Sequence, residues 1–277
     1  MELEEIPSNT LDVLTDIAIA SPAVCALRIS QDSADAERVG RVFESIFNSP
    51  EAAAIIDLLY NRHKDDDYYE SVLDYCVKGN LQAVLDEYAH VTGTNEIAEA
   101  LESSNLRDVT YNIEAFDKCE PNQSIVKSMR ANFAVQFVNK AVTDKTMQRI
   151  TNVRNAFNSP LRPFILSSTS VGQEGLDFHL YARKVLHWNL PSNPVDLEQR
   201  EGRVNRYECL AIRRNVSKLY GADTLDWTEM FSRAEEDLKS DSSEMVPYWC
   251  LPLAKIPPEK RNDLQLIERL VPIYPLS

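Results

Sequence analysis

Residues 195–207 read VDLEQREGRVNRY and place Arg200, Arg203 and Arg206 at intervals of three. On a helix, at about 100° per residue, the three positions fall within an arc of about 120°. The stretch therefore predicts a helix with three guanidinium groups on one face. Like charges at this spacing repel, so the arrangement favours an anionic partner. Neutralisation by the interspersed glutamates and by solvent is the alternative explanation.

The residues around this stretch strengthen the case for an anionic ligand. Asn193 can cap the helix, and Pro194 can occupy its first position. About thirty residues upstream, residues 166–179 read LSSTSVGQEGLDFH and follow an apolar run typical of a strand. Two glycines there allow backbone N–H groups to approach a ligand, and Asp177 can accept a hydrogen bond from a hydroxyl group.

These two segments resemble motifs V and VI of superfamily-two helicases. Residues 168–177 are similar to A-T-D-V-A-A-R-G-L-D, and residues 199–206 fit Q/H-R-x-G-R-x-x-R at every fixed position. The motif V matches are Thr169, Val171, Gly175, Leu176 and Asp177. The glutamine in place of histidine at the start of motif VI indicates DExH or Snf2-like relatives. Neighbouring segments resemble large bacterial helicase-related proteins.

The resemblance implies a role for each matched residue. Arg203 and Arg206 would be arginine fingers that neutralise charge on the γ-phosphate of ATP in the transition state, as catalytic residues. Arginine suits this task because its planar fork stays charged and binds phosphate oxygens bidentately. The residues expected beside ATP are Gly175, Asp177, Gln199 and Arg200; those expected to contact DNA or RNA are Thr169 and Gly172.

Charge is distributed unevenly along this acidic chain of 277 residues, whose formal net charge is −14. Residues 1–120 hold 25 acidic and 8 basic side chains, whereas residues 121–277 hold 18 and 21. The acidic part should repel phosphates, so contact with a nucleotide or nucleic acid is expected in the C-terminal part. The acidic part is a candidate for binding a protein partner.

We expect an α/β fold, in which a RecA-like parallel-sheet lobe is joined to a large acidic all-α region. Three segments are predicted. Residues 1–120 form the acidic helical region, which is insertion-like. Residues 121–240 form the helicase C-terminal lobe with motifs V and VI, and residues 241–277 form a proline-rich, irregular extension.

Hydrophobic periodicity predicts individual elements. Residues 36–47 and 81–91 carry apolar side chains at helical spacing, and a further helical stretch spans roughly 123–157. Short apolar runs at 163–169 and 184–190 predict buried strands. Residues 109–116, VTYNIEAF, are a candidate for the motif IV strand that the resemblance requires.

The sequence lacks the parts that would hold ATP by themselves. No G-x-x-x-x-G-K-[S/T] phosphate loop occurs, and none of the 7 glycines precedes a lysine. We therefore expect no ATP hydrolysis by this chain alone. A first RecA-like lobe, on the full-length protein or on a separate subunit, would hold ATP with Mg²⁺. The alternatives are a catalytically inactive module that binds a protein partner through its acidic helices, and a stand-alone single-domain hydrolase.

Other groups of residues in the sequence give weak support for a metal-binding or separate catalytic site. Asp86 and Glu87 resemble a D-E-x-H motif, but the histidine, His90, comes one position late and the pattern is helical. Glu87-x-x-His90 is used in di-iron bundles, but a second such motif is missing. His179 and His187 lack a third ligand at suitable spacing. We expect no metal site, and these histidines are predicted to pack or to make supporting hydrogen bonds.

Two further features of the sequence predict the cellular compartment of the protein. No run approaches the roughly 20 consecutive apolar residues of a membrane span, and the N-terminus MELEEIPSNT is acidic, unlike a signal peptide. The 5 cysteines are dispersed and form no Cys-x-x-Cys pair, which is typical of reduced thiols. A cytoplasmic protein without a membrane partner is therefore expected.

Overall fold

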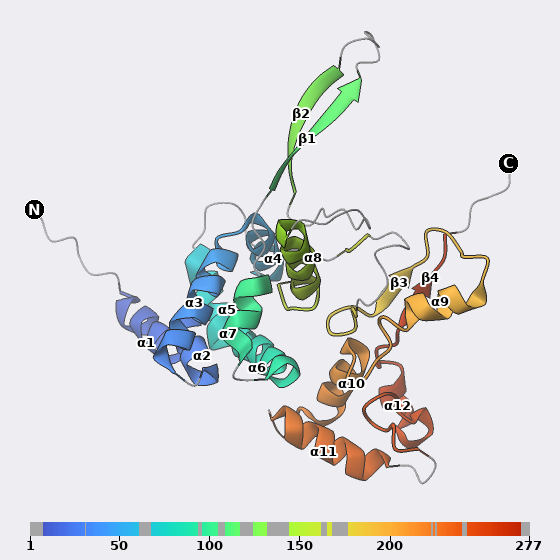
Figure 1. Cartoon of the computed structure of the whole chain (residues 1–277). Helices are drawn as coiled ribbons and strands as arrows, with labels where there is room; N and C mark the ends of the chain where they lie inside the picture. The colour runs from blue at the N-terminus through green and yellow to red at the C-terminus, as the bar shows by residue number, and fades with distance from the viewer. Residues whose placement is uncertain are drawn as a thin grey trace, which may run out of the picture.

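The computed structural model of the chain is drawn in Figure 1 and describes residues 8–30, 32–60, 68–93, 96–104, 109–116, 124–131, 144–161, 165–167, 177–222, 224, 226–239 and 243–272. Only the backbone is described for residues 50–51, 109–116, 124–131 and 144–150. The helices are α1 Thr10–Ala20, α2 Pro22–Ile29, α3 Ser33–Phe47, α4 Pro50–Tyr60, α5 Tyr68–Val77, α6 Asn80–Thr92, α7 Ile97–Ser104, α8 Asp144–Phe157, α9 Pro194–Glu201, α10 Leu210–Tyr220, α11 Trp227–Leu238 and α12 Pro258–Arg261. The strands are β1 Val109–Phe116, β2 Ser124–Ala131, β3 Lys184–Leu186 and β4 Glu268–Leu270.

Helices α1 to α7 form a bundle whose core follows the predicted periodicity. On α6, Leu81, Leu85 and Tyr88 are buried at intervals of four and three, which places them on one helix face. On α3, Val39 and Phe43 are buried in the same way. The predicted helices at 36–47 and 81–91 are therefore confirmed. Tyr181 and Leu210, from the C-terminal half, belong to the same core.

The first two helices contain the most apolar segment of the chain. Thr10–Ile29 is long and apolar enough, by length and composition, to cross a membrane, although polar residues interrupt its apolar run. The segment is broken at Ser21, where α1 ends, and Ser21 caps α2 through the amide of Val24. Cys25 of α2 is fully buried in the bundle core. Packing thus accounts for α2, whereas α1 keeps most of its apolar side chains exposed.

A hairpin interrupts the helical architecture after α7. Strands β1 and β2 pair antiparallel, from Val109 opposite Ala131 to Phe116 opposite Ser124, and project from the body of the molecule (Figure 1). The prediction of a helix from about residue 123 was wrong for β2. Its helical pattern was overridden by pairing with β1, which supplies backbone partners that no local pattern contains. Residues 109–116 do form a strand, but in this hairpin and not beside β3.

The parallel sheet of the described residues has two strands, β3 and β4, in the register Lys184 to Glu268 and Leu186 to Leu270. β3 confirms a strand at 184–186 within the run predicted at 184–190, but the expectation of a buried strand was wrong, since Leu186 is 57% exposed. Residues 165–167 of the run at 163–169 form no strand, and its other residues lie outside the described ones. The α/β expectation therefore rests on these two strands in a largely helical structure. The C-terminal extension was expected to be irregular, but it supplies β4, because its backbone pairs with β3 across 80 residues of chain.

A second core lies in the C-terminal part. It joins α10 and α11 to residues 246–267, with Val216, Ala234 and Ile256 among its buried members. Tyr248 and Trp249 were weighed as base-stacking side chains. The Tyr248 ring stacks between Phe231 and Tyr207, at centroid distances of 5.4 and 5.3 Å, which supports the packing alternative for Tyr248. Trp249 stays partly exposed.

Candidate nucleotide site

The helix before residues 203–208, which we call the arginine turn, begins as predicted. The Asn193 side chain accepts a hydrogen bond from the amide of Val195 at 3.0 Å, and Pro194 is the first residue of α9. The helix is shorter than predicted, however, because α9 ends at Glu201 and Gly202 is its C-terminal cap. The expectation of one continuous helical face was therefore wrong. Glycine is a poor helix former, and the chain leaves α9 there as a turn.

The structure brings Asp177 and Arg206 together. Arg206 Nη2 lies 2.8 Å from Asp177 Oδ1, and the two side chains are 39% and 43% exposed. Such an exposed ion pair contributes roughly 0–1 kcal/mol to stability, so it is weak enough to be exchanged for another anion. The Nε of Arg206 is buried and has no hydrogen-bond partner among the described residues.

The other predicted site residues are placed differently. No described residue forms an ion pair or side-chain hydrogen bond with Arg203, whose side chain is partly exposed. Arg200 donates to the carbonyl of Asn189 at 3.0 Å, and Gln199 is exposed on α9. Of the residues matched to motif V, Thr169, Gly172 and Gly175 lie outside the described residues.

Backbone hydrogen bonds fasten the segment after Asp177 to the arginine turn. The amide of Phe178 donates to the carbonyl of Arg203 at 2.9 Å, and the amide of Leu210 donates to the carbonyl of His179 at 2.9 Å. These bonds hold the two segments at a fixed spacing. Asp177 and Arg206 therefore face each other because the backbone just after Asp177 is joined to the chain on both sides of Arg206.

A buried arginine, Arg213 of α10, connects this site to the helical bundle. Its side chain is 0% exposed, and its Nε lies 2.9 Å from a carboxylate oxygen of Glu87 on α6. Nη1 donates to the carbonyl of Glu208 at 2.7 Å, and Nη2 donates to the carbonyl of Leu180. The ring of Tyr181 lies 5.4 Å from the guanidinium carbon. One side chain thus holds the chain beyond Arg206, the chain beyond Asp177, and α6.

Sequence reasoning missed Arg213, although a signal was present. Arg213 lies three residues after Leu210 and three before Val216, so helical spacing puts it on the buried face of α10. A charge on an apolar helix face indicates a buried partner. Glu87 was considered only as a metal or D-E-x-H residue, and its actual role is to pair with Arg213.

The histidines behave mainly as predicted. His90 Nε2 lies 2.9 Å from Glu208 Oε2, and its ring stacks on Trp227 and Phe231. His187 is buried, with Nε2 3.2 Å from Glu201 Oε1. Within the part of the chain that the structure describes, no three His, Cys, Asp or Glu side chains are grouped to hold a metal ion.

Glu208 has an unusual backbone. Its φ of 47° is the one positive φ of a non-glycine residue in the described ranges, and such a conformation costs roughly 1–3 kcal/mol. Its amide donates to the carbonyl of Tyr248 at 2.8 Å, which helps to fix it. Burial would raise the pKa of its carboxyl group, but hydrogen bonds from His90 and Tyr207, together with the charges of His90 and Arg213, hold the pKa below its usual value.

A cavity of about 350 Å³ lies beside Asp177, between α6, α7 and α8. Asn158 at its wall donates to the carbonyl of Asp177 at 2.5 Å. The Oδ1 of Asn158 and the Nδ1 of His179 are buried without partners among the described residues. Exposed Arg154 is a further lining residue. The acidic bundle thus contacts the same segment that carries Asp177.

The pKa of His179 gives a testable pH dependence. Burial lowers this pKa, Arg206 and Arg213 lower it further, and Asp177 opposes them without reversing the direction. The unfolded chain therefore takes up a proton first, so the folded state should lose stability as pH falls below the ordinary value of 6.5. We expect the free energy of unfolding to fall between about pH 7.5 and pH 5.5, and to fall less in His179→Gln. Urea denaturation of both proteins measures this; equal pH dependence would contradict it.

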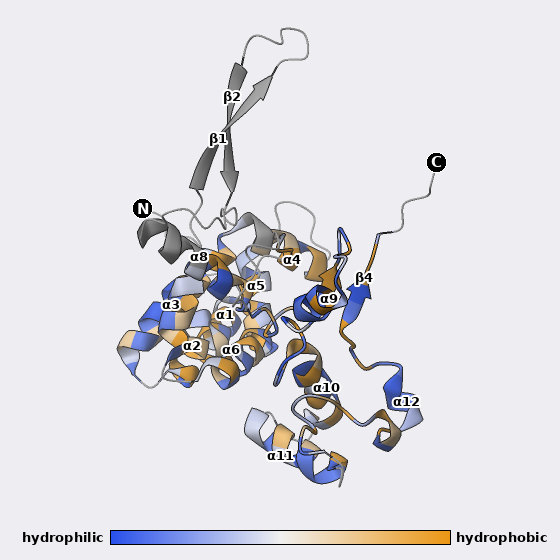
Figure 2. Cartoon of the chain, turned by 45° about the vertical axis from the view of Figure 1, so that its right-hand side comes forward, coloured by the Kyte–Doolittle hydropathy of each residue, from blue (hydrophilic) through white to orange (hydrophobic). Residues whose placement is uncertain are grey.

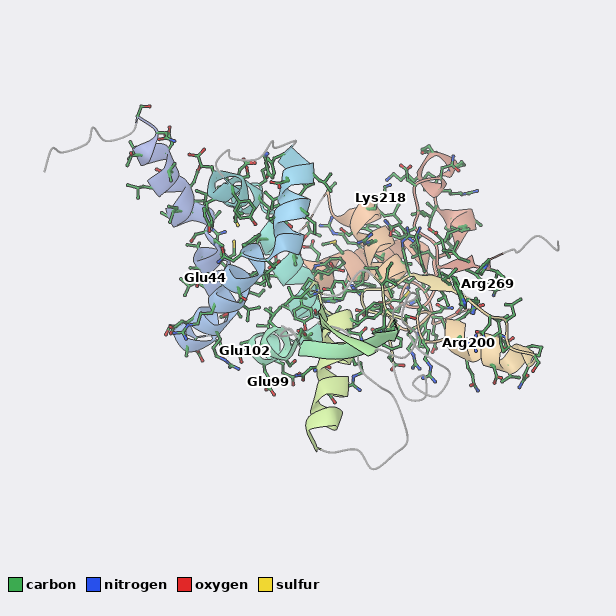
Figure 3. The ribbon with its side chains drawn as sticks, turned by 90° about the horizontal axis from the view of Figure 1, so that it is seen from above. Glu44, Glu99, Glu102, Arg200, Lys218 and Arg269 are labelled. Atoms are coloured by element: carbon green, nitrogen blue, oxygen red, sulfur yellow. The ribbon has the colours of Figure 1, made fainter. Side chains whose placement is uncertain are left out.

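Charge is segregated in space as well as in sequence. Figure 3 shows Glu44, Glu99 and Glu102 on one side of the molecule, and Arg200, Lys218 and Arg269 on the other. The basic side chains come from α9, α10 and β4, the elements around the arginine turn. An anionic ligand is therefore attracted to the side of the molecule that carries that turn.

Comparison with known proteins gave a match to a family model. No curated protein and no solved structure matches the chain. Residues 98–208 match the family model described as the helicase conserved C-terminal domain. The matched range runs from α7 to Glu208 and includes Asp177, Arg203 and Arg206. Over this range the chain is similar to a helicase C-terminal lobe, which implies a RecA-like fold and, in general terms, binding of nucleotide and nucleic acid.

Proposed function

We propose that this chain is the C-terminal part of an ATP-dependent nucleic-acid helicase or translocase, and that Arg203 and Arg206 are its arginine fingers. The observation that carries the proposal is the state of these two side chains. Among the described residues, Arg203 has no side-chain partner, and the one side-chain partner of Arg206 is the partly exposed Asp177. A guanidinium group without a structural partner is available for a phosphate ligand.

The site would be completed by a first RecA-like lobe. That lobe would hold ATP with Mg²⁺, because this sequence contains no phosphate loop. Arg203 would donate to the γ-phosphate directly, and Arg206 would exchange Asp177 for phosphate oxygens. Asp177, Arg200, Gln199 and Gly175 would then lie beside the nucleotide.

DNA or RNA would lie on the basic side of the molecule. Thr169 and Gly172 of the motif V segment would contact its phosphates, as the helicase resemblance implies. The acidic side, marked by Glu44 and Glu99 in Figure 3, would repel the same phosphates.

Arg203→Ala is the cleanest test of this proposal. Because no described residue depends on its guanidinium group, the substitution should change the free energy of unfolding by less than about 0.5 kcal/mol. Nucleic-acid-stimulated ATP hydrolysis should nevertheless fall by about 100-fold or more. The measurement uses the tagged chain purified gently from its native cells together with the first lobe, or the full-length protein that carries both.

Arg214→Ala is the matched control. Arg214 is an exposed arginine of α10 that bonds to Gln265 at 3.3 Å, away from the arginine turn. It should keep wild-type activity. If Arg203→Ala hydrolyses ATP as fast as Arg214→Ala in the presence of nucleic acid, Arg203 is not an arginine finger.

A second candidate function, binding of a protein partner through the acidic helices, is favoured by α1. Leu11 is 76% exposed and Leu14 is 57% exposed, and the charged residues of α1 are two aspartates. Figure 2 shows apolar residues along α4 as well, where Leu58 is 79% exposed. An exposed apolar face on a helix whose own charged residues are aspartates fits an amphipathic helix with basic flanks.

This candidate is tested by substitution on α1. A Leu11→Asn, Leu14→Asn double variant should lose a basic partner that co-purifies with the wild type, and added salt should weaken the wild-type complex. Leu190→Asn, at an exposed leucine before α9, should keep the partner. Equal recovery of the partner by both variants would exclude α1 as its binding site.

A further inference from the structure

The arginine turn, residues 203–208, is held from the acidic bundle by two side-chain contacts of α6. His90 Nε2 lies 2.9 Å from Glu208 Oε2, and the two side chains are 18% and 15% exposed. Glu87, one helical turn earlier, pairs with Arg213 at 2.9 Å. Arg213 in turn donates to the carbonyl of Glu208 at 2.7 Å. Both contacts therefore converge on Glu208, two residues beyond Arg206.

Glu208 is the residue where the turn most needs such support. Its backbone has a φ of 47°, which a glutamate adopts only when its surroundings fix it. Its side chain is fixed by His90 and Tyr207, its carbonyl by Arg213 and its amide by Tyr248. Two of these four supports depend on α6, since Arg213 is itself oriented by Glu87.

The same arginine also holds the other half of the ion pair. Arg213 Nη2 donates to the carbonyl of Leu180, three residues beyond Asp177. The backbones of Leu210 and His179 are joined at 2.9 Å between these two anchors. A displacement of α6 would therefore reach both Arg206 and Asp177 through Arg213.

We propose that α6 of the acidic helical region positions the arginine turn, with His90 and Glu87 as positioning residues for Arg206. The effect on catalysis rests on the proposed function; the effect on the turn does not. His90 packs against Trp227 and Phe231 and bonds to Glu208. It acts through Glu208, by fixing where the backbone leaves the turn.

Two substitutions of His90 separate its hydrogen bond from its packing. His90→Phe keeps a ring beside Trp227 and Phe231 but cannot bond to Glu208. His90→Gln keeps a donor for Glu208 and loses the ring. Gln82→Ala is the control, because Gln82 bonds to Asp86 on the same helix, away from Glu208.

The first measurement is amide hydrogen exchange over residues 203–210, which needs no catalytic activity. We expect exchange in His90→Phe to be faster than in the wild type by about tenfold or more, because a turn without the His90 contact opens more often and then exposes the Glu208 and Leu210 amides, which donate to Tyr248 and His179. His90→Gln should restore exchange to within about twofold, and Gln82→Ala should match the wild type. Equal exchange in His90→Phe and Gln82→Ala would overturn the proposal.

The second measurement is nucleic-acid-stimulated ATP hydrolysis with the first lobe present. His90→Phe should lower kcat by about tenfold with little change in the KM for ATP, because the substitution misplaces Arg206 in the transition state. His90→Gln should recover kcat. Faster exchange without ATP hydrolysis in any sample would support the positioning by α6 and contradict the proposed function. Hydrolysis lost in Arg203→Ala but unchanged in His90→Phe would support the function and overturn the positioning.

Discussion

Arg206→Ala is expected to lower nucleic-acid-stimulated ATP hydrolysis by about 10³-fold or more, the range in which arginine fingers act in phosphoryl transfer. The physical reason is that charge grows on the transferred phosphoryl group. The planar guanidinium group of Arg206 would meet that charge with two parallel hydrogen bonds. The loss should appear in kcat, with the KM for ATP much less affected, because the contact strengthens in the transition state.

The structure makes this experiment interpretable. Among the described residues, the side-chain contact that Arg206→Ala removes is the ion pair with Asp177, in which both partners are about two fifths exposed, so the free energy of unfolding should fall by less than about 1 kcal/mol. Arg206→Lys keeps the charge without the fork and should recover only part of the activity. Arg214→Ala is again the control. Wild-type turnover in Arg206→Ala, measured with the first lobe present, would remove Arg206 from the site.

Arg213→Met is expected to destabilise the folded chain by about 3–5 kcal/mol, the cost of leaving a buried charge without its partner. Arg213 is fully buried, and its loss would leave the carboxylate of Glu87 unpaired. The carbonyls of Glu208 and Leu180 would lose their donors at the same time. The measurement is urea unfolding of the whole chain, followed by circular dichroism and by tryptophan fluorescence.

The control for this prediction lies on the same helix. Arg214→Met, at the neighbouring exposed residue, should change stability by less than about 0.5 kcal/mol. A Glu87→Leu, Arg213→Met double variant should recover part of the loss, since removing both charges leaves neither unpaired. If Arg213→Met and Arg214→Met unfold alike, the buried ion pair does not join the bundle to the C-terminal part.

Local patterns predicted the helices well because their signals are local. The cap at Asn193 is made by a side chain two residues from the amide that it binds. The buried faces of α3 and α6 follow from spacing alone. Strand β2 was missed because the residues that make it a strand are those of its partner β1, and the pattern within β2 does not contain them. Strand β4 was missed because it pairs with β3, some 80 residues earlier.

For the candidate site, the sequence predicted the identity of the residues but not the contacts that position them. It identified Asp177, Arg203 and Arg206 from motif spacing, and the structure places Asp177 against Arg206. It did not indicate that α9 stops at Glu201, since the choice between a longer helix and a turn at Gly202 depends on the segment packed against it. The amide of Phe178, for example, takes the carbonyl of Arg203 as its acceptor.

By itself the sequence determined the helical bundle, the cap at the start of α9, the uneven charge and the spacing of the arginines, all of which depend on neighbours within a few residues. Only the tertiary structure decided the partner and the burial of each arginine. Arg203 has no described side-chain partner, Arg206 is paired at the surface, and Arg213 is buried. The difference arises because Glu87 lies 126 residues from Arg213, and such a distant carboxylate leaves no trace in the local pattern around an arginine.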